Sequence, residues 1–477
     1  MILTPPSQFW LRTPIRSQES IEGDHAMLRS GRTVLIALTF AVLSSVLALA
    51  QSGTSTLERL LVFDGVSNGG QPWAAPTLDQ AGNLYGATSV GGIGKCSIGK
   101  WTVGCGTVYK LAPPAKGSTQ WTETLIYQFA GTTDGDYPVG SLVFDKAGNL
   151  YGTTEYGGGT TPACGSVFKL TPPASGHGPW TKVVLYKFTC EADGGFPQSG
   201  LTFDKAGNLY GTTIWGGDCN LSSGCGGVVY ELSPPTLAGD AWTETVLYTF
   251  LQSPDGAEPQ STLLFDASGK LYGTTILGGS SAECGLDEGC GTIFQLTPPS
   301  TAGGSWTEKI LYTFGNQGFD GEAPRSGLVF AKSGIFYGVT EEGGASSRGT
   351  VYQLTAPTSS TGSWSETILY SFGGSDGSSP FGTPVLGSDG SIYGVTTFGG
   401  TDRGNVFQLA PPAVNGDPWT ETSLYSFNST QYPLAGLTLG KGGWLYGTTM
   451  GGVVEGDCAT SRSGQNIGCG EVFRILP

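Results

Sequence analysis

The feature that most constrains this chain is one short segment that occurs seven times. In its second copy it reads Asn-Leu-Tyr-Gly-Thr-Thr, and its Tyr recurs at intervals of 53 to 66 residues as Tyr85, Tyr151, Tyr210, Tyr272, Tyr337, Tyr393 and Tyr446. In every copy a Gly lies three residues before the Tyr, another follows it directly, and a Thr lies three residues after it. Such a period is typical of solenoids, propellers and other repeat folds.

Each copy contains four runs that suit β-strands. In the second copy they cover residues 141–145, 149–154, 165–170 and 180–188, which are rich in Val, Leu, Phe, Tyr and Thr and bounded by Gly or Pro. The Gly before the Tyr supplies the positive φ of a tight turn between the first two runs. The Pro-Pro pair after the third run ends it, because Pro has no N–H to donate. No run has a helical period.

Four antiparallel strands repeated seven times predict an all-β fold, a seven-bladed β-propeller of four-stranded antiparallel blades. The seventh copy stops after its third strand, at residues 470–475, while residues 56–63 resemble the fourth strands of the other copies. We therefore expect the N-terminal strand to complete the last blade and to close the ring, which leaves no open sheet edge. A straight solenoid would not need this complementarity.

The repeat resembles a known family. Its Phe-Asp-x-x-Gly-Asn-Leu-Tyr-Gly-Thr-Thr core and the following Gly-x-Val-Phe-x-Leu-x-Pro-Pro are similar to the GloVer tandem repeat of choice-of-anchor bacterial surface proteins, from about residue 56 to residue 477. The resemblance implies export and a repeat array, often with a C-terminal sorting segment. No such segment follows the last repeat in this sequence, and the resemblance supplies no activity and no catalytic residues.

The N-terminus has the pattern of a targeting segment. Arg29 and Arg32 precede an apolar run that ends in Ala48-Leu49-Ala50, as in a secretory signal peptide. We predict an N-terminal extension and signal peptide over residues 1–50, with a start at Met27 and cleavage after Ala50, and one propeller domain over residues 51–477. The alternative is an uncleaved membrane anchor. Cleavage would leave no membrane span, so the sequence predicts a protein secreted to the periplasm or the medium.

Ten cysteines in an exported chain indicate disulfides. Proximity in sequence pairs Cys96 with Cys105, Cys219 with Cys225, Cys284 with Cys290, and Cys458 with Cys469. Cys164 and Cys190 remain, and they either pair with each other or stay free. Metal binding is the rival interpretation, but the spacing is not Cys-x-x-Cys and histidine partners are missing.

Charge and histidine content limit the partners. A net charge of −15 disfavours nucleic acid and anionic membranes and favours neutral or cationic partners. Only His25 and His177 occur, and removal of the signal peptide would leave His177 alone, so no two-His metal site is predicted. An acidic face suits Ca²⁺, but no calcium-binding motif is present, and we predict no cofactor. A monomer is expected.

One face of the predicted propeller gathers candidate binding residues. With strands numbered outward from the axis, the loops between second and third strands share a face with the connections between blades. Those connections carry an Asp-Gly motif, and two tryptophans lie in the loops; the candidates are Asp134, Asp193, Asp255, Asp320, Asp376, Trp101 and Trp215. The aspartates form either an acidic funnel for a ligand or simply the turns themselves, with Asp bonded to backbone N–H groups. Carboxylates present in only some copies are better candidates for an asymmetric site; they are Asp136, Glu155, Glu191, Glu258, Glu322 and Glu341.

Two functions fit this sequence. The first is a secreted module that binds an extracellular glycan, peptide or protein, because a rigid scaffold carries variable loops and no nucleophile–base arrangement is visible. The alternative is a carboxylate-based glycosidase or a polysaccharide lyase, since glycosidic chemistry needs only two carboxyl groups about 5–10 Å apart.

Overall fold

The computed structural model describes residues 55–477 apart from short gaps. The gaps are residues 99–100, 160–162, 177, 219–225, 238, 281–283, 285–288, 302, 317, 333, 360, 401–402, 415, 429 and 453–467. The predicted signal peptide, His177, the Cys219–Cys225 pair and Cys458 therefore lie outside the described residues. Residues 53–477 form one compact unit. None of the described helices is long and apolar enough to cross a membrane.

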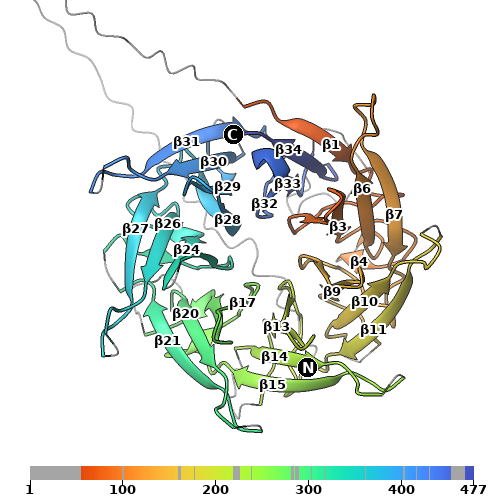
Figure 1. Cartoon of the computed structure of the whole chain (residues 1–477), viewed down its shortest axis with the longest axis horizontal. Helices are drawn as coiled ribbons and strands as arrows, with labels where there is room; N and C mark the ends of the chain where they lie inside the picture. The colour runs from red at the N-terminus through yellow and green to blue at the C-terminus, as the bar shows by residue number, and fades with distance from the viewer. Residues whose placement is uncertain are drawn as a thin grey trace, which may run out of the picture. The chain divides into compact units, whose positions relative to one another are not determined.

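Seven four-stranded antiparallel sheets make up this unit, and they form a seven-bladed β-propeller (Figure 1). Blade 1 contains β2 (Thr77–Leu78), β3 (Leu84–Thr88), β6 (Thr107–Ala112) and β7 (Thr122–Gln128). Blade 2 contains β8 (Val143–Phe144), β9 (Leu150–Thr154), β10 (Ser166–Thr171) and β11 (Thr181–Lys187). Blade 3 contains β12 (Thr202–Phe203), β13 (Leu209–Thr213), β14 (Val228–Ser233) and β15 (Thr243–Thr249), and blade 4 contains β17 (Leu264–Phe265), β18 (Leu271–Thr275), β20 (Thr292–Thr297) and β21 (Thr307–Thr313).

Blades 5 to 7 follow the same order. Blade 5 contains β23 (Val329–Lys332), β24 (Ile335–Thr340), β26 (Thr350–Thr355) and β27 (Ser365–Ser371). Blade 6 contains β28 (Ser378–Leu386), β29 (Ile392–Phe398), β30 (Asn405–Ala410) and β31 (Thr420–Ser426). Blade 7 contains β32 (Thr438–Leu439), β33 (Leu445–Thr449), β34 (Glu471–Ile475) and β1 (Glu58–Val62). Short two-residue strands form three small two-stranded antiparallel sheets outside the blades: β4 (Ser97–Ile98) with β5 (Trp101–Thr102), β16 (Gly256–Ala257) with β19 (Leu277–Gly278), and β22 (Gly321–Glu322) with β25 (Glu342–Gly343). A 3₁₀ turn covers Lys441–Gly443.

The predicted fold is confirmed, including its closure. First strands lie toward the centre of the ring and fourth strands toward its outside, as β17 and β21 show in Figure 1. The N-terminal strand β1 pairs with the C-terminal β34 in antiparallel register, with Glu58 opposite Arg474. The first strand of blade 2 is shorter than the run predicted for residues 141–145, because only Val143 and Phe144 pair with the second strand.

The repeated Tyr-Gly pair has a packing explanation. In blade 2 a Cβ on Gly152 would lie 2.7 Å from the ring of Phe168 in the third strand, so no side chain fits there. Tyr151 is buried and its hydroxyl donates a hydrogen bond to Asp145, 3.0 Å away. Its ring lies 6.3 Å from that of Trp242 in the next blade.

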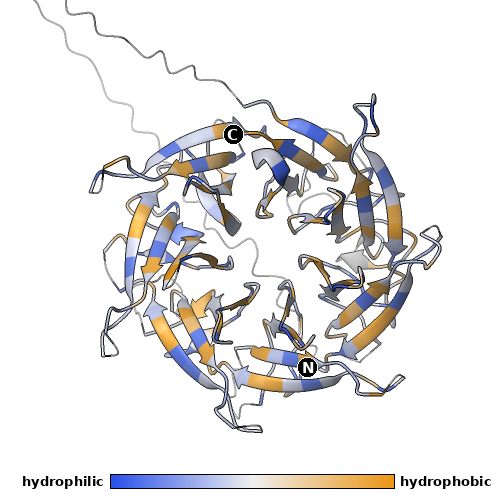
Figure 2. Cartoon of the chain, viewed as in Figure 1, coloured by the Kyte–Doolittle hydropathy of each residue, from blue (hydrophilic) through white to orange (hydrophobic). Residues whose placement is uncertain are grey.

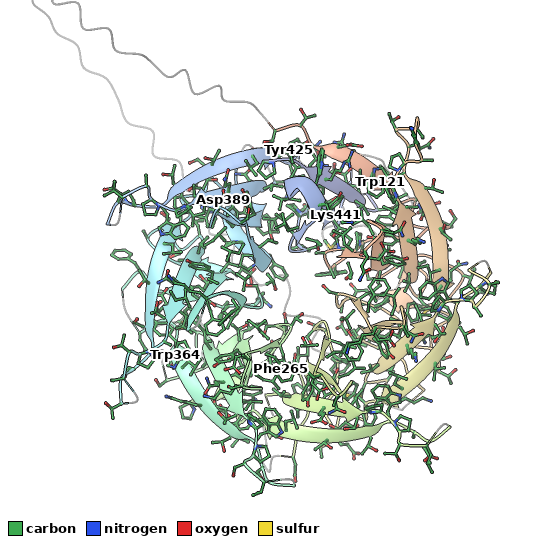
Figure 3. The ribbon with its side chains drawn as sticks, in the orientation of Figure 1. Trp121, Phe265, Trp364, Asp389, Tyr425 and Lys441 are labelled. Carbon is green, nitrogen blue, oxygen red and sulfur yellow. A yellow bond between two sulfur atoms is a disulfide. The ribbon has the colours of Figure 1, made fainter. Side chains whose placement is uncertain are left out.

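In blades 1 to 6 the tryptophan at the start of the fourth strand therefore packs against the blade before it. Six such Trp–Tyr contacts occur at centroid distances of 6.0 to 6.4 Å, and Figure 3 shows Trp121 and Trp364 between neighbouring blades. Together with buried Leu, Val and Phe side chains from adjoining sheets they form apolar clusters that span the blade boundaries, for example the cluster containing Phe129 and Phe168. The hydropathy colouring of the strands in Figure 2 shows the apolar residues of this core.

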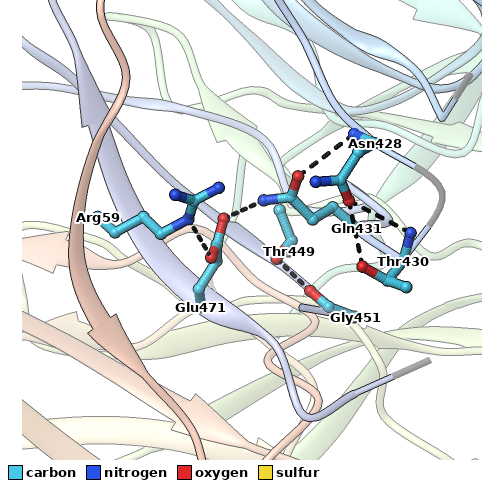
Figure 4. Close-up of polar contacts among 7 residues, drawn as sticks. All are labelled: Arg59, Asn428, Thr430, Gln431, Thr449, Gly451 and Glu471. Atoms are coloured by element: carbon cyan, nitrogen blue, oxygen red, sulfur yellow. Dashed lines mark hydrogen bonds and ion pairs between the residues drawn. The ribbon is translucent and has the colours of Figure 1, made fainter. Parts of the chain in front are cut away.

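The closing blade carries a polar network (Figure 4). Nε of Arg59 on β1 lies 2.9 Å from Oε2 of Glu471 on β34, and Gln431 donates a hydrogen bond to the other carboxylate oxygen. The Glu471 side chain is fully buried. A second ion pair joins Arg474 to Glu58 across the same two strands. These charge pairs link the two ends of the propeller chain without a covalent bond.

Candidate functional site

A strained backbone position recurs at the end of six blade connections. The residue before a Pro has a positive φ of 51° to 58° in six blades, although none of them is Gly; these residues are Gln71, Tyr137, Phe196, Glu258, Ala323 and Ser379. Residues other than Gly rarely adopt this backbone conformation, and they keep it only where the surrounding structure stabilises it. In blade 2 the N–H of Tyr137 donates to Cys105 of blade 1 at 3.2 Å, and its carbonyl accepts from Glu155 at 3.0 Å. The strained residue thus joins two blades.

Aromatic side chains gather around this position in blades 1 to 3. The ring centroids of Trp73 and Tyr137 are 6.4 Å apart, those of Tyr137 and Tyr156 are 5.9 Å apart, and those of Tyr156 and Phe196 are 5.5 Å apart. Trp73, Tyr137 and Tyr156 are partly exposed, whereas Phe196 is buried. The four rings therefore form a continuous apolar strip that solvent reaches.

Two carboxyl groups lie within this strip. Asp136 and Tyr156 face each other across an antiparallel bridge, with N–H···O distances of 3.1 and 3.2 Å, which places Asp136 beside the rings. Glu155, next to Tyr156, is only 4% exposed, and its carboxyl group is hydrogen-bonded to Tyr156 and Gln198. We call Trp73, Asp136, Tyr137, Glu155, Tyr156 and Phe196 the aromatic–carboxyl cluster.

Burial disfavours the charged form of both carboxyl groups. It raises the pKa of Asp136 to about 6. Burial also raises the pKa of Glu155 to about 7, because its effect exceeds that of the hydrogen bonds from Tyr156 and Gln198, and the negative charge of Asp136 adds a smaller increase. Oδ1 of Asp136 is buried and accepts no hydrogen bond from any described residue. The pair therefore combines two carboxyl groups of raised pKa with one buried acceptor that no described residue uses.

Two of the disulfides, Cys96–Cys105 and Cys164–Cys190, lie beside the backbone of this site. Cys96 pairs with Cys105, Cys164 with Cys190, and Cys284 with Cys290, and Cys469 is disulfide-bonded as well. The sequence left the pairing of Cys164 and Cys190 open, and the structure joins them. The carbonyl of Cys164 accepts the N–H of Phe196 at 2.8 Å, as Cys105 does for Tyr137. The disulfides therefore hold the backbone that positions the aromatic rings.

The five predicted Asp-Gly aspartates are hydrogen-bonded within their own blade connections. Each accepts a hydrogen bond from the fourth-strand Tyr of its own blade at 2.6 to 3.1 Å, and each also accepts a backbone N–H of its turn; they are Asp134, Asp193, Asp255, Asp320 and Asp376. These contacts favour the turn interpretation over the ligand funnel.

The two predicted tryptophans lie in different places. Trp101 is in the β4–β5 hairpin, between the linked Cys96 and Cys105. Trp215 is partly buried and bridges Gly195, so in blade 3 it occupies the position that Tyr156 has in blade 2. Trp215 therefore places an aromatic residue at the equivalent point of blade 3, outside the cluster.

A second group of carboxylates lies in blade 5. Glu322 and Glu342 face each other across the antiparallel β22–β25 pair, and their mutual repulsion adds to burial in raising the pKa of Glu322. Glu341 forms an ion pair with Arg325. Glu258 has the strained backbone position of blade 4, whereas the Glu191 side chain is exposed. In the described part of the chain no three His, Cys, Asp or Glu side chains are placed to hold a metal ion.

A repeated buried carboxyl group, which the sequence interpretation missed, lies on the fourth strands, beside the connection that enters each blade. The fourth strand of five blades carries a Glu whose Oε1 is buried without a hydrogen bond from the described residues; these seam glutamates are Glu123, Glu244, Glu308, Glu366 and Glu421. Burial, together with the negative charge of the preceding connection, raises their pKa, for example to about 7 in Glu244 beside Asp193. The Trp-Thr-Glu pattern of the fourth strands was the signal that could have indicated them.

Fold and site together define the class: a disulfide-braced, seven-bladed propeller with an asymmetric aromatic and acidic strip at its inner edge. The chain belongs to the Gloeobacter/Verrucomicrobia repeat family, whose model matches residues 45–286 and again residues 282–477. The resemblance to the GloVer repeat is thereby confirmed. No curated protein matches the chain.

Solved structures share only the architecture. A luciferin-regenerating enzyme is 11% identical over 89% of this chain and 95% of its own, with a TM-score of 0.40. An oxidoreductase (glucose dehydrogenase) from Thermus thermophilus is 15% identical over 88% of this chain and 100% of its own, with a TM-score of 0.39. A family AA12 carbohydrate-active enzyme from Trichoderma reesei is 12% identical over 89% and 99%, with a TM-score of 0.37. These likenesses carry no conclusion about the activity of this chain.

Proposed function

We propose that the protein is an exported module that binds an extracellular carbohydrate at the aromatic–carboxyl cluster. The observation that carries this proposal is the strip of Trp73, Tyr137 and Tyr156, which are partly exposed and lie beside two carboxyl groups. Aromatic faces stack on sugar rings, while carboxylate oxygens accept hydrogen bonds from sugar hydroxyl groups. The strip occupies three of the seven blades, so it breaks the symmetry that a purely structural motif would keep.

Export is supported by the disulfides. Three complete disulfides among the described residues indicate an oxidising compartment, the periplasm or the extracellular medium. The route is a proposal: a signal peptide over residues 1–50, cleaved after Ala50, would deliver the chain there.

A glycan array probed with the purified exported protein tests the proposal. Tyr156→Ala removes a ring from the cluster, and we expect it to abolish retention of any glycan that the native protein binds. Phe319→Ala is the matched control, because Phe319 is 72% exposed and lies in the connection to blade 5, outside the cluster. Retention that survives Tyr156→Ala would exclude this site. Binding of peptides or proteins alone would contradict a carbohydrate ligand.

A glycosidase or lyase is the second candidate, favoured by the raised pKa of two neighbouring carboxyl groups. Burial raises the pKa of Asp136 to about 6, and burial with the charge of Asp136 raises that of Glu155 to about 7, so near neutral pH one can act as an acid while the other is ionised. Product analysis of any retained glycan separates the two functions. If the native protein shortens the glycan chains, and neither the Asp136→Asn variant nor the Glu155→Gln variant does so, the protein is a catalyst. If the glycan is retained without being cleaved, only the binding function remains.

A further inference from the structure

This inference rests on the proposed function and names its ligand class. We infer that the aromatic–carboxyl cluster binds a glycan that carries amino groups, with the ammonium held between the carboxyl groups and the aromatic rings. Three features of the described residues support a cationic ligand: an unused carboxylate oxygen, a missing counter-ion and the arrangement of the rings.

The unused oxygen is Oδ1 of Asp136. It is buried and has no hydrogen-bond donor among the described residues. Gly157 packs closely against it, because a Cβ there would lie 2.9 Å from Oδ1 and 2.6 Å from Cα of Gly135. A buried acceptor without a partner is costly, and the cost is larger for a charged group. An ammonium group supplies both the missing donor and the opposite charge, which a neutral sugar hydroxyl does not.

The missing counter-ion is evident from a comparison with blade 5. Glu341 follows the repeated Thr of its second strand as Glu155 does in blade 2, and Arg325 forms an ion pair with it. Arg325 comes directly after the Pro of its blade, and the equivalent residue in blade 2 is Val139. The groups that shift the pKa of Glu155 are Tyr156, Gln198 and Asp136, and none of them is a cation. Blade 2 therefore buries the same carboxyl group without the guanidinium that balances it in blade 5.

The rings complete the site. Trp73, Tyr137, Tyr156 and Phe196 lie in contact, with centroids 5.5 to 6.4 Å apart, around the backbone of Asp136. Aromatic faces attract ammonium groups, most strongly when these lose their water. The net charge of −15 raises the local concentration of cationic ligands further.

Two oligosaccharides that differ in N-acetylation, and therefore in charge, test the inference. The probes are the tetramer of glucosamine and its fully N-acetylated counterpart, titrated by calorimetry into the full exported protein at pH 6 and low salt. We expect the charged tetramer to bind at least tenfold more tightly than the acetylated one. Asp136→Asn and Glu155→Gln, each made singly, should remove most of this preference without changing the fold, because each replaces a carboxyl group by an amide of the same shape.

Glu191→Gln is the matched control, since it removes one exposed carboxylate from the next connection and should leave the preference unchanged. Equal affinity for both tetramers, or tighter binding of the acetylated one, would overturn the inference and leave the proposed carbohydrate site intact. A preference that survives both cluster substitutions would also overturn it, because the charge would then be recognised elsewhere. If neither tetramer nor any glycan on the array binds, the proposed function itself fails.

Discussion

Nζ of Lys182 lies 2.9 Å from Oδ1 of Asp134, across the boundary between blades 1 and 2. The Lys side chain is only 3% exposed, and its ammonium also lies 4.8 Å from the ring centroid of Phe129. At the same point of their fourth strands, five other blades have a seam glutamate. At five other boundaries a seam glutamate lies near an acidic residue of the preceding connection, whereas blade 2 has the Lys182–Asp134 ion pair in this place. The boundary between blades 1 and 2 therefore shows what an opposite charge at this position contributes.

Reversal of this charge should make the blade 1–2 boundary sensitive to pH. In Lys182→Glu the new carboxyl group faces Asp134, so at pH 8 we expect a loss of about 2–4 kcal/mol of unfolding free energy, as when a buried ion pair is broken. At pH 5 the new Glu is protonated in the folded state, as the seam glutamates are, and the loss should be clearly smaller. Urea unfolding at both pH values measures this. Lys187→Glu, on the exposed side of the same strand, is the control; an equal loss at both pH values would contradict the prediction.

The seam glutamates should make the native protein less stable as pH rises. Burial, with the charge of Asp320 added, raises the pKa of Glu366 from 4.5 to about 8. Between these values the folded state binds more protons than the unfolded state, so the unfolding free energy falls as pH increases and levels off above pH 8. Glu366→Gln should raise the thermal midpoint at pH 9 by about 1–3 °C and have little effect at pH 5. A midpoint of the native protein that does not change from pH 5 to pH 9 would refute this.

Closure of the ring should depend on the Arg59–Glu471 pair. Arg59→Ala leaves a fully buried carboxylate without its cation, and we expect a loss of about 2–4 kcal/mol, moderated because Arg59 is 40% exposed. Blades 1, 4 and 5 have a Thr at the position equivalent to Glu471. In each of them this Thr forms a hydrogen bond of 2.8 Å with a Thr of the second strand; in blade 1 the two residues are Thr107 and Thr88. The double variant Arg59→Ala with Glu471→Thr should therefore recover most of the loss. Chemical denaturation of the native protein and these two variants measures this. No recovery in the double variant would show that the ion pair is not what stabilises the closure.

The repeat made the fold predictable. The Tyr-Gly core, the Pro-terminated third strands and the extra strand at residues 56–63 determine the number of blades and the closure, because each is a local pattern with one structural solution. The turn aspartates such as Asp134 were also legible, since an Asp-Gly turn binds its own backbone wherever it occurs.

The candidate site could be predicted only in part. Asp136 and Glu155 were distinguishable as carboxylates without counterparts in most copies, but their proximity depends on the bridge from Asp136 to Tyr156. That bridge forms because Tyr137 takes a positive φ before Pro138, a conformation that no local pattern demands of a Tyr. The cluster is created by contact between a blade connection and a strand end, and sequence periodicity does not report such contacts.

The Gly that follows each repeated Tyr should be required for space rather than for backbone conformation. A Cβ on Gly152 would lie 2.7 Å from both Leu142 and Phe168, so Gly152→Ala should cost about 1–3 kcal/mol through overpacking. Combining it with Phe168→Leu, which removes part of the obstructing ring, should cost less than the sum of the two single changes. Gly148→Ala is the control: Gly148 has a φ of 83° and a Cβ added there would meet nothing within 4 Å, so its cost comes from the backbone and should add to that of Phe168→Leu. Strict additivity in both double variants, measured by urea denaturation, would show that the ring of Phe168 is not the reason for the Gly.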